Sequence, residues 1–288
     1  MLKTRIIAVL NINNGIVVQS INFQDYLPVG KPKIAIDFLD SWGIDEIVLL
    51  NIGNNKKHKN VFYKNLDTYT KNCQTPIAAG GGVSSVKDIE KIISNGADKV
   101  VINSCAHKSP SIIKKGEKLF GKQAIVVSID IKKNDTQYSV FTHSGKQIID
   151  KDLKSIIMQA QDNGAGELLI NSIDNDGKKN GYDLKLIEFV KRYASIPIII
   201  CGGVGNVKHF SNVLNYRLSG LAAGNFFHYT EHSVITLKQQ LSRVKRNIRI
   251  DTISNYKNKK FDKDGKQLPM NDYDFENLRF KFIEEEII

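Results

Sequence analysis

The stretch PIAAGGGVSSVK at residues 76–87 returns as PIIICGGVGNVK at residues 197–208. Each matched position lies 121 residues further along the chain, and a shift of 119 residues pairs Asn11 with Asp130. In both copies a short apolar run ends in glycines and leads into a stretch that favours a helix. An internal repeat of this length indicates that the chain consists of two copies of one βα-containing half.

Apolar runs with strand character alternate with helix-like stretches along the whole chain. The runs lie at residues 6–10, 47–50, 76–79, 100–102, 125–129, 168–170, 196–200 and 221–223. The clearest helix-like stretches are residues 85–95, 150–163 and 183–193. This alternation predicts a parallel sheet covered by helices. Together with the repeat it predicts an α/β fold, a (βα)8 TIM barrel built from two (βα)4 half-barrels, which takes about 250 residues.

The barrel is predicted for residues 1–250, and residues 251–288 form a C-terminal extension. The extension has 7 basic and 9 acidic side chains, so the chain's net charge of +11 divides into +13 on the barrel and −2 on the extension. Its aromatic residues are Tyr256, Phe261, Tyr273, Phe275, Phe280 and Phe282. This composition suits either a segment packed on the barrel or a mobile tail.

The composition, with 41% hydrophobic and 25% charged residues, is that of a soluble globular protein. The positive charge suits nucleic acid, an anionic surface or a phosphorylated small molecule. No nucleic-acid-binding motif accompanies it, and the basic run 56–59 suits a solvated loop. The N-terminal apolar run 6–10 is too short for a signal peptide or a membrane span, which predicts a cytoplasmic protein with no membrane partner. Cys73, Cys105 and Cys201 lack CxxC spacing, so we expect buried thiols, no metal and no cofactor.

Polar residues and glycines follow the predicted strands at the end where barrel enzymes bind their ligands. They are Asn11, Asn51, Gly80, Gly81, Gly82, Asn103, Ser104, Asp130, Asn171, Ser172, Gly202, Gly203, Gly224 and Asn225. Backbone N–H groups at glycine turns approach an anion closely, and a following helix N-terminus favours negative charge. Two glycine clusters at symmetry-related positions predict two phosphate sites, and hence a ligand with a phosphate at each end. The alternative is that these glycines serve only tight turns.

Asp130 is the strongest candidate for acid–base chemistry. It ends a strand-like run and shares the inward parity of Val126 and Ser128. A carboxylate at this position can take up and release a proton. The alternative role is to cap the following loop.

Four charged residues stand where apolar strands begin, at the opposite end of the predicted barrel. They are Arg5, Glu46, Lys99 and Glu167. Arg5 shares the parity of Asn11, and Lys99 shares that of Asn103, so we expect the four side chains to converge on the barrel floor. Buried ions are costly unless they are paired with one another. From the residues alone, a structural plug of ion pairs is at least as well supported as a functional gate.

These residues and their order resemble the cyclase subunit of imidazole glycerol phosphate synthase over about residues 1–250. The resemblance is carried by RIIA (5–8), NF (22–23), GIDEI (43–47), GGG (80–82), GADKV (96–100), IN (102–103), VFT (140–142), SGK (144–146), GAGE (164–167), SID (172–174), DG (176–177), GYD (181–183) and GG (202–203).

The resemblance implies a partner, a route and a reaction. In that family a glutaminase subunit docks at the N-terminal face as a heterodimer, and its ammonia crosses the barrel to a bis-phosphorylated ribulosyl-formimino-aminoimidazole. The products are imidazole glycerol phosphate and aminoimidazole carboxamide ribotide, on the histidine pathway. The family's gate corresponds to the four charged residues, and its docking face to Asp98 and Gln123. Ser144, Asp176 and Gly177 correspond to substrate-binding positions.

Three positions depart from the family pattern. Family members use two aspartates, of which Asp130 is present and the other is Asn11, an amide that cannot transfer a proton near neutral pH. The family's loop lysine is Gln19, and the aspartate after the second strand is Asn51. This pattern favours a paralogue that conducts ammonia to an amidotransferase, such as one that forms an acetamidino sugar for a surface glycan. The alternatives are a complete cyclase, and drift in an Asn-rich chain.

Overall fold

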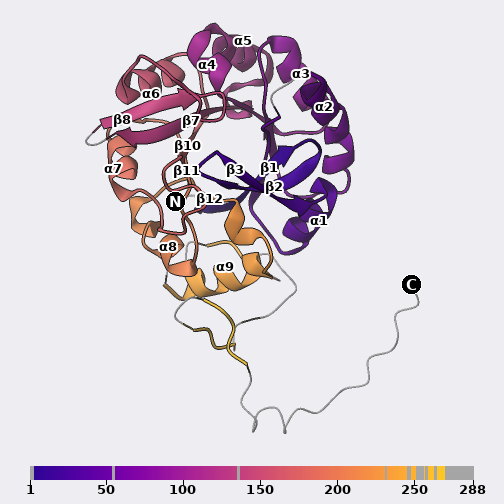
Figure 1. Cartoon of the computed structure of the whole chain (residues 1–288), viewed down its shortest axis with the longest axis vertical. Coiled ribbons are helices and arrows are strands. Elements are labelled where there is room, and N and C mark those ends of the chain that lie inside the picture. The colour runs from indigo at the N-terminus through magenta and orange to yellow at the C-terminus, as the bar shows by residue number, and fades with distance from the viewer. Residues whose placement is uncertain are drawn as a thin grey trace.

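The computed structural model describes residues 3–53, 56–134, 137–230, 232–244, 248–250, 256, 259–262 and 265–269. Eight parallel strands form a closed ring surrounded by helices (Figure 1). They are β1 (Arg5–Asn13), β4 (Glu46–Asn51), β5 (Ile77–Gly80), β6 (Lys99–Ile102), β7 (Ile125–Asn134), β10 (Glu167–Ser172), β11 (Ile198–Cys201) and β12 (Gly220–Ala223). The first and last barrel strands, β1 and β12, pair with each other, and the further pairing of β10 with β7 closes the ring. The (βα)8 barrel predicted from the repeat is therefore confirmed.

Helices follow the barrel strands and cover the outside of the ring. They are α1 (Pro32–Ser41), α2 (Lys56–Thr70), α3 (Val86–Ser94), α4 (Ser104–Lys108), α5 (Ser111–Phe120), α6 (Leu153–Asp162), α7 (Leu184–Tyr193), α8 (Val207–Ser211) and α9 (Ser233–Val244). Short 3-10 helices lie at Lys122–Ala124, Leu214–Tyr216 and Asn225–Phe227. Ser85, Asp152 and Asp183 cap α3, α6 and α7 with side-chain hydrogen bonds, which explains why these helices begin where the sequence predicts.

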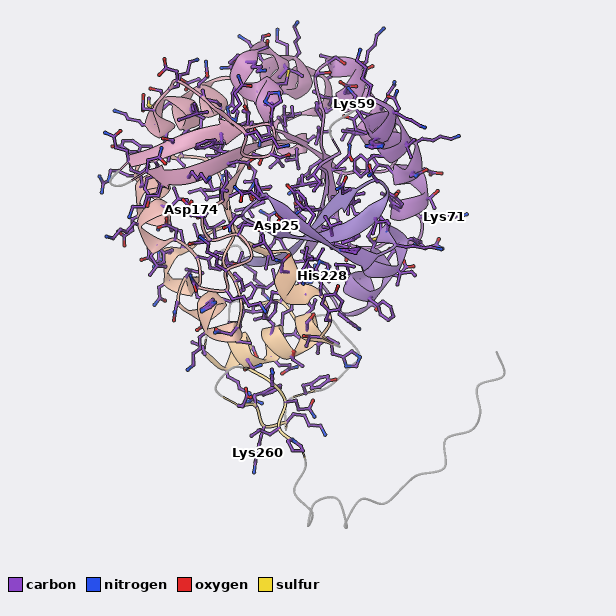
Figure 2. The ribbon with its side chains drawn as sticks, viewed as in Figure 1. Asp25, Lys59, Lys71, Asp174, His228 and Lys260 are labelled. Carbon is purple, nitrogen blue, oxygen red and sulfur yellow. The ribbon has the colours of Figure 1, made fainter. Side chains whose placement is uncertain are left out.

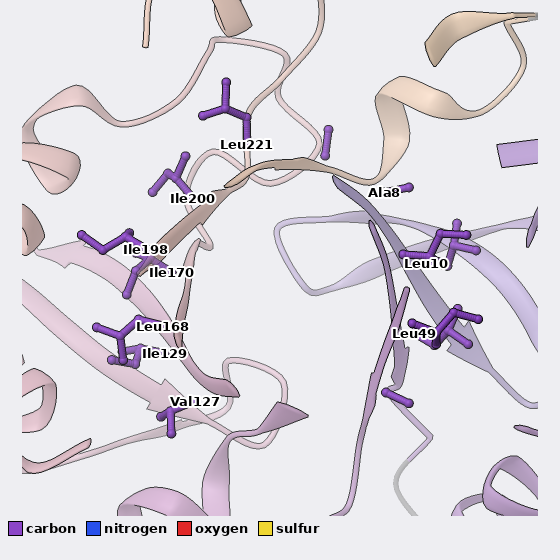
Figure 3. Packing of buried hydrophobic residues seen from close by; sticks show 14 of the residues in the cluster. Ala8, Leu10, Leu49, Val127, Ile129, Leu168, Ile170, Ile198, Ile200 and Leu221 are labelled. Carbon is purple, nitrogen blue, oxygen red and sulfur yellow. The ribbon is translucent and has the colours of Figure 1, made fainter. Parts of the chain in front are cut away.

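Strand alternation divides the buried residues into two clusters. One row of each barrel strand faces the helices and joins their apolar faces, as Figure 3 shows for Leu10, Leu49, Ile129 and Leu168. The other row fills the inside of the ring. It consists of Ile7, Val9, Val48, Ala78, Val101, Val126, Leu169, Ile199 and Ala222. The interior of the barrel is thus a packed apolar layer with polar residues at both of its ends.

Two pairs of antiparallel strands that extend from the barrel were not predicted from the sequence. β2 (Ile16–Ile21) and β3 (Asp25–Gly30) follow β1, and β8 (Gln137–Thr142) and β9 (Gln147–Ile148) follow β7. They occupy equivalent places in the two halves, in keeping with the repeat. The residues of β3, β8 and β9 are mostly polar or partly exposed, and β2 has an apolar run of only three residues, Ile16 to Val18, which is too short to mark it as a barrel strand.

The described residues of the extension lie against α9. The guanidinium of Arg243 lies 5.4 Å from the ring centre of Phe261, and Gln240 donates to the carbonyl of Gly265 at 3.1 Å. Tyr256 contacts His232. The choice between a packed segment and a mobile tail also depended on four aromatic residues that lie outside the described residues: Tyr273, Phe275, Phe280 and Phe282.

Within the described residues, no helix is long and apolar enough to cross a membrane. The same residues contain no cluster of His, Cys, Asp and Glu side chains suited to a metal ion.

Candidate active site at the ends of the barrel

The four charged residues predicted to converge do meet on the barrel floor, and we call them the quartet. Arg5 pairs with both Glu46 and Glu167. Lys99 lies 3.0 Å from Glu46 and 3.1 Å from Glu167, so the two cations alternate with the two anions. Both glutamates are buried, and burial alone disfavours the charge of Arg5, yet the two carboxylates raise its pKa. The mutual pairing offsets the cost of burying these charges.

At the other end, Asp130 sits at the centre of a hydrogen-bonded group that we call the Asp130 layer. Asn103 donates to one carboxylate oxygen of Asp130 at 2.7 Å, and Asn171 donates to the other at 2.8 Å. Ser128 contributes a longer hydrogen bond of 3.4 Å and accepts one from Asn171. β7 supplies Ser128 and Asp130, β10 supplies Asn171, and Asn103 directly follows β6, so the end of the barrel itself positions the carboxylate.

The environment of Asp130 suits proton transfer. Burial raises its pKa to about 6, although the hydrogen bonds from Asn171, Asn103 and Ser128 oppose that shift. A second carboxyl, Asp176, also has its pKa raised to about 6, chiefly by burial and in part by the charge of Asp130. A carboxyl whose pKa lies close to neutrality can both accept and release a proton.

Asn11 lies on the inward row of β1, above Ile7 and Val9 of the apolar interior. It is therefore on the same side of the barrel wall as Asp130, its counterpart in the repeat. An amide in this place hydrogen-bonds but does not exchange protons at neutral pH.

Asn51 lies at the same end of the barrel, as the last residue of β4, but the described hydrogen bonds do not join it to the Asp130 layer. Glu46 and Val48 face the barrel interior, so alternation along β4 turns Asn51 towards the outside. Its side-chain oxygen accepts from the N–H of Gly53 at 3.3 Å. Gln19 lies on β2 rather than on a barrel strand. The change at Asn11 is therefore the one that alters the inward-facing acid–base groups.

The glycine turns have a structural reason that needs no ligand. Gly81 has φ of +113° and its missing Cβ would meet the backbone of Asn51; Gly203 has φ of +97° and would meet that of Gly181. Gly82 and Gly202 also have positive φ, and Gly224 does not. The tight-turn alternative thus accounts for these glycines, and phosphate binding at them stays a prediction.

Three of the predicted substrate-binding residues, Asp176, Gly177 and Asn225, contact the β2–β3 hairpin. Ser20 donates its hydroxyl to Asp176 at 2.6 Å, and the backbone N–H of Phe23 donates to the same carboxylate at 3.3 Å. The side chain of Asn225 exchanges two hydrogen bonds with the backbone of Ser20, at 3.2 and 2.8 Å. Gly177 approaches the same segment, at the carbonyl of Ser20.

Comparison with known proteins supplies the family. The model of a family described as "Histidine biosynthesis protein" matches residues 5–233. The chain belongs to this family. It is 37% identical over 252 residues to imidazole glycerol phosphate synthase subunit HisF of Petrotoga mobilis, covering 87% of this chain and 100% of that one. It is 39% identical over 243 residues to the HisF subunit of Natranaerobius thermophilus, covering 84% and 97%.

A further member of the family is a provisionally named imidazole glycerol phosphate synthase subunit hisF2 of Vibrio vulnificus. The identity is 36% over 259 residues, covering 90% of this chain and 95% of that one. The resemblance read from the motifs is therefore confirmed at the level of the family.

The remaining predicted site residues of this family member lie at the two opposite ends of the barrel. Ser104 opens α4 and accepts from the backbone N–H of His143, and Ser144 lies in the turn between β8 and β9. At the floor end, Asp98 accepts from the N–H of Ile77 at 2.8 Å, and Gln123 is exposed. A docking role for Asp98 and Gln123 stays a prediction.

Two residues that support the site were missed by the sequence analysis. Ser20 holds Asp176, as described above, and His107 of α4 lies with Nε2 at 3.2 Å from the carbonyl oxygen of Ser128. Burial lowers the pKa of His107, which favours the neutral ring, and its Nε2–H donates to the carbonyl of Ser128. This carbonyl belongs to β7 and lies one residue beyond the last pair of β7 with β6. Neither residue belongs to a motif, and no pattern in the sequence marks it.

Proposed function

We propose that this chain is an ammonia-conducting subunit of the imidazole glycerol phosphate synthase type, with a glutaminase docked at the barrel floor near Asp98 and Gln123. The names of its relatives support this, because they are subunits of that synthase. Ammonia from the glutaminase crosses the quartet, which acts as a gate, and then the barrel interior.

The layering of the barrel supports a route of this kind. Above the quartet lies the apolar interior, and above that the Asp130 layer. An apolar layer excludes ammonium far more strongly than neutral ammonia, because an unpaired charge is costly to desolvate. Arg5 and Lys99 are both partly exposed, at 26% and 20% of their side chains, and in this proposal displacement of Lys99 opens the floor.

The chain's own cyclase step is impaired in this proposal. The single observation that carries it is that one carboxylate, Asp130, and one amide, Asn11, occupy the two equivalent strand ends. Removal of one positioned acid–base group costs roughly 10²- to 10⁴-fold in rate. The ammonia then serves a separate amidotransferase, of the kind that forms an acetamidino sugar in a surface-glycan pathway.

The alternative is a complete cyclase, which converts the bis-phosphate substrate and ammonia into imidazole glycerol phosphate and aminoimidazole carboxamide ribotide. The intact Asp130 layer favours it, since the carboxyl with a pKa of about 6 is held by three hydrogen-bonding side chains.

Turnover of the bis-phosphate substrate with ammonium separates the two. We expect little turnover by the unchanged chain and an increase of roughly 100-fold or more in Asn11→Asp, which restores a second proton-transfer group. Asn13→Asp, which adds the same charge two residues further along the inward row, is the matched control and should give no increase. Equal turnover by the unchanged chain and Asn11→Asp would contradict the proposal.

The partner is tested separately by mixing the full chain with a glutaminase subunit of this synthase type. We expect the two to co-elute and the chain to stimulate glutamine hydrolysis, whatever the result with the bis-phosphate. Absence of both effects excludes the conducting role.

A further inference from the structure

A buried ion pair lies beside the quartet, between α9 and the loop that leads into β4. The ammonium Nζ of Lys238 lies 2.7 Å from Oδ1 of Asp45 and 2.5 Å from the carbonyl oxygen of Gly43. The side chains of Lys238 and Asp45 are 2% and 7% exposed, so Lys238 is buried far more deeply than either cation of the quartet. Because removing a lysine from water is costly, its position here calls for a physical reason.

Asp45 holds the backbone of β1 at its start. Its Oδ2 accepts from the N–H of Ile6 at 2.7 Å, and its own N–H donates to the carbonyl of Ile6 at 3.1 Å. Ile6 directly follows Arg5, and Asp45 directly precedes Glu46. On the other side of β1, the N–H of Arg5 donates to the carbonyl of Ser219 at 3.1 Å. Asp45 therefore fixes, on the β4 side, the backbone that carries Arg5 and Glu46.

The second half of the barrel shows that strand pairing alone does not need this carboxylate. The repeat places Gly166 where Asp45 stands and Ile125 where Ile6 stands. The N–H of Gly166 donates to the carbonyl of Ile125 at 2.9 Å, so the backbone hydrogen bond is kept without a side chain. A Cβ at Gly166 would lie 2.0 Å from the carbonyl oxygen of Lys122, which leaves no room for an aspartate. The carboxylate and its lysine are thus an addition to the first half.

The energetics of buried ion pairs favour a geometric role for this addition. Replacing such a pair by uncharged side chains is often neutral for stability, whereas breaking it leaves an uncompensated buried charge. A buried pair therefore disfavours every arrangement in which its two partners separate. The quartet needs strand starts that are fixed in this way, because its two cations are shared between two buried carboxylates.

We propose that Lys238 is a positioning residue of the quartet. Through Asp45 it fixes the starts of β1 and β4, and so directs Arg5 and Glu46 towards each other. The inference rests on the proposed function in taking the quartet as the gate for ammonia. The positioning itself is measured in the chain alone, without that assumption.

Hydrogen exchange of the Nε–H of Arg5, followed by NMR in the full chain, tests the positioning; the signal is identified by its absence in Arg5→Lys. We expect exchange roughly tenfold faster in Lys238→Met, as when a local arrangement loses about one hydrogen bond. Lys59→Met is the matched control, because it breaks a 2.9 Å ion pair with the buried Asp88 at the opposite end of the barrel. Exchange at Arg5 should stay within about twofold in this control, since distant sites act independently.

A double variant, Lys238→Met with Asp45→Asn, keeps the test valid if Lys238→Met does not fold. It removes both charges together, so no uncompensated buried charge is left and we expect its urea midpoint to stay close to that of the unchanged chain. Exchange at Arg5 should again be faster. Unchanged exchange in both variants, or an equal increase in Lys59→Met, would overturn the proposal.

Addition of a glutaminase subunit of this synthase type measures the effect on the gate. We expect Lys238→Met still to co-elute with it, because Asp98 and Gln123 are unchanged. The kcat of stimulated glutamine hydrolysis should fall roughly 2- to 30-fold, with the KM for glutamine unchanged, and Lys59→Met should keep full stimulation. If the unchanged chain gives no stimulation, the conducting role fails and the exchange result stands. If it stimulates and Lys238→Met keeps the full kcat, the positioning role alone fails.

Discussion

At the scale of single residues, the protonation of Asp130 determines what the site can do. Its carboxyl is buried yet accepts hydrogen bonds from Asn103 and Asn171, and burial prevails, so that its pKa rises to about 6. The folded protein therefore favours the protonated carboxyl more than the unfolded chain does. This contribution to stability is complete below the pKa of an unfolded aspartate and is lost as the pH rises through about 6.

When the pH is raised from about 4 to about 7, we expect the free energy of unfolding of the unchanged chain to fall by about 3 kcal/mol more than that of Asp130→Asn. The amide variant cannot titrate, so it lacks this loss. Urea unfolding across the pH series provides the measurement. Asp176→Asn is measured alongside, because Asp176 has its pKa raised to about 6 as well. Parallel curves for the unchanged chain and Asp130→Asn would show that the carboxyl is not perturbed.

At the scale of elements, the quartet joins the starts of β1, β4, β6 and β10. Glu46 and Glu167 come from equivalent strands of the two halves, and Arg5 contacts both. The floor is thus closed by ions from four strands that are far apart in sequence. Because both carboxylates are buried, their stability depends on the two cations.

We expect Arg5→Leu to lower the free energy of unfolding by about 3 to 5 kcal/mol, because Lys99 alone then balances two buried carboxylates. Lys33→Leu on α1 breaks the ion pair with Asp37, in which both side chains are partly exposed, and should cost less than about 1 kcal/mol. Denaturant unfolding of the two variants gives the comparison. Equal losses would mean that the quartet is no more than a solvated surface network.

At the scale of the whole molecule, the barrel and the extension differ in charge and in packing. In the side-chain view the exposed Asp25 of the β2–β3 hairpin projects over the middle of the ring and Lys71 lies at the outer edge, whereas Lys260 lies beyond α9 (Figure 2). Among the described residues, the extension contacts α9 through side chains that include Arg243 and Gln240, and Gly265 lies close to Val207 of α8. The closed ring of strands needs none of them.

A chain shortened to residues 1–250 should therefore fold and unfold in one cooperative step. We expect a loss of about 2 to 4 kcal/mol, from the hydrogen bonds that Gln240, Arg243 and His232 make with the extension and from the contact of Phe261 with Arg243. Circular dichroism and denaturant unfolding of the shortened chain provide the check. If the shortened chain showed no cooperative transition, the extension would be required for the barrel to fold.

The sequence by itself determined the barrel, its two halves and the convergence of the quartet. These follow from strand alternation and from the repeat, both of which are local or periodic and need no knowledge of the loops. The inward direction of Asp130 followed from its neighbours Val126 and Ser128 in the same way.

Only the tertiary structure decided the contact of Ser20 with Asp176 and the cavity that Lys132 lines between the β2–β3 hairpin and the β8–β9 turn. Both depend on how the β2–β3 and β8–β9 segments, which come from different halves, fold over the end of the barrel. Their contacts join residues more than a hundred positions apart, as in the 156-residue separation of Ser20 and Asp176. No periodicity links such pairs, because the chain brings them together only when the ring of strands has closed.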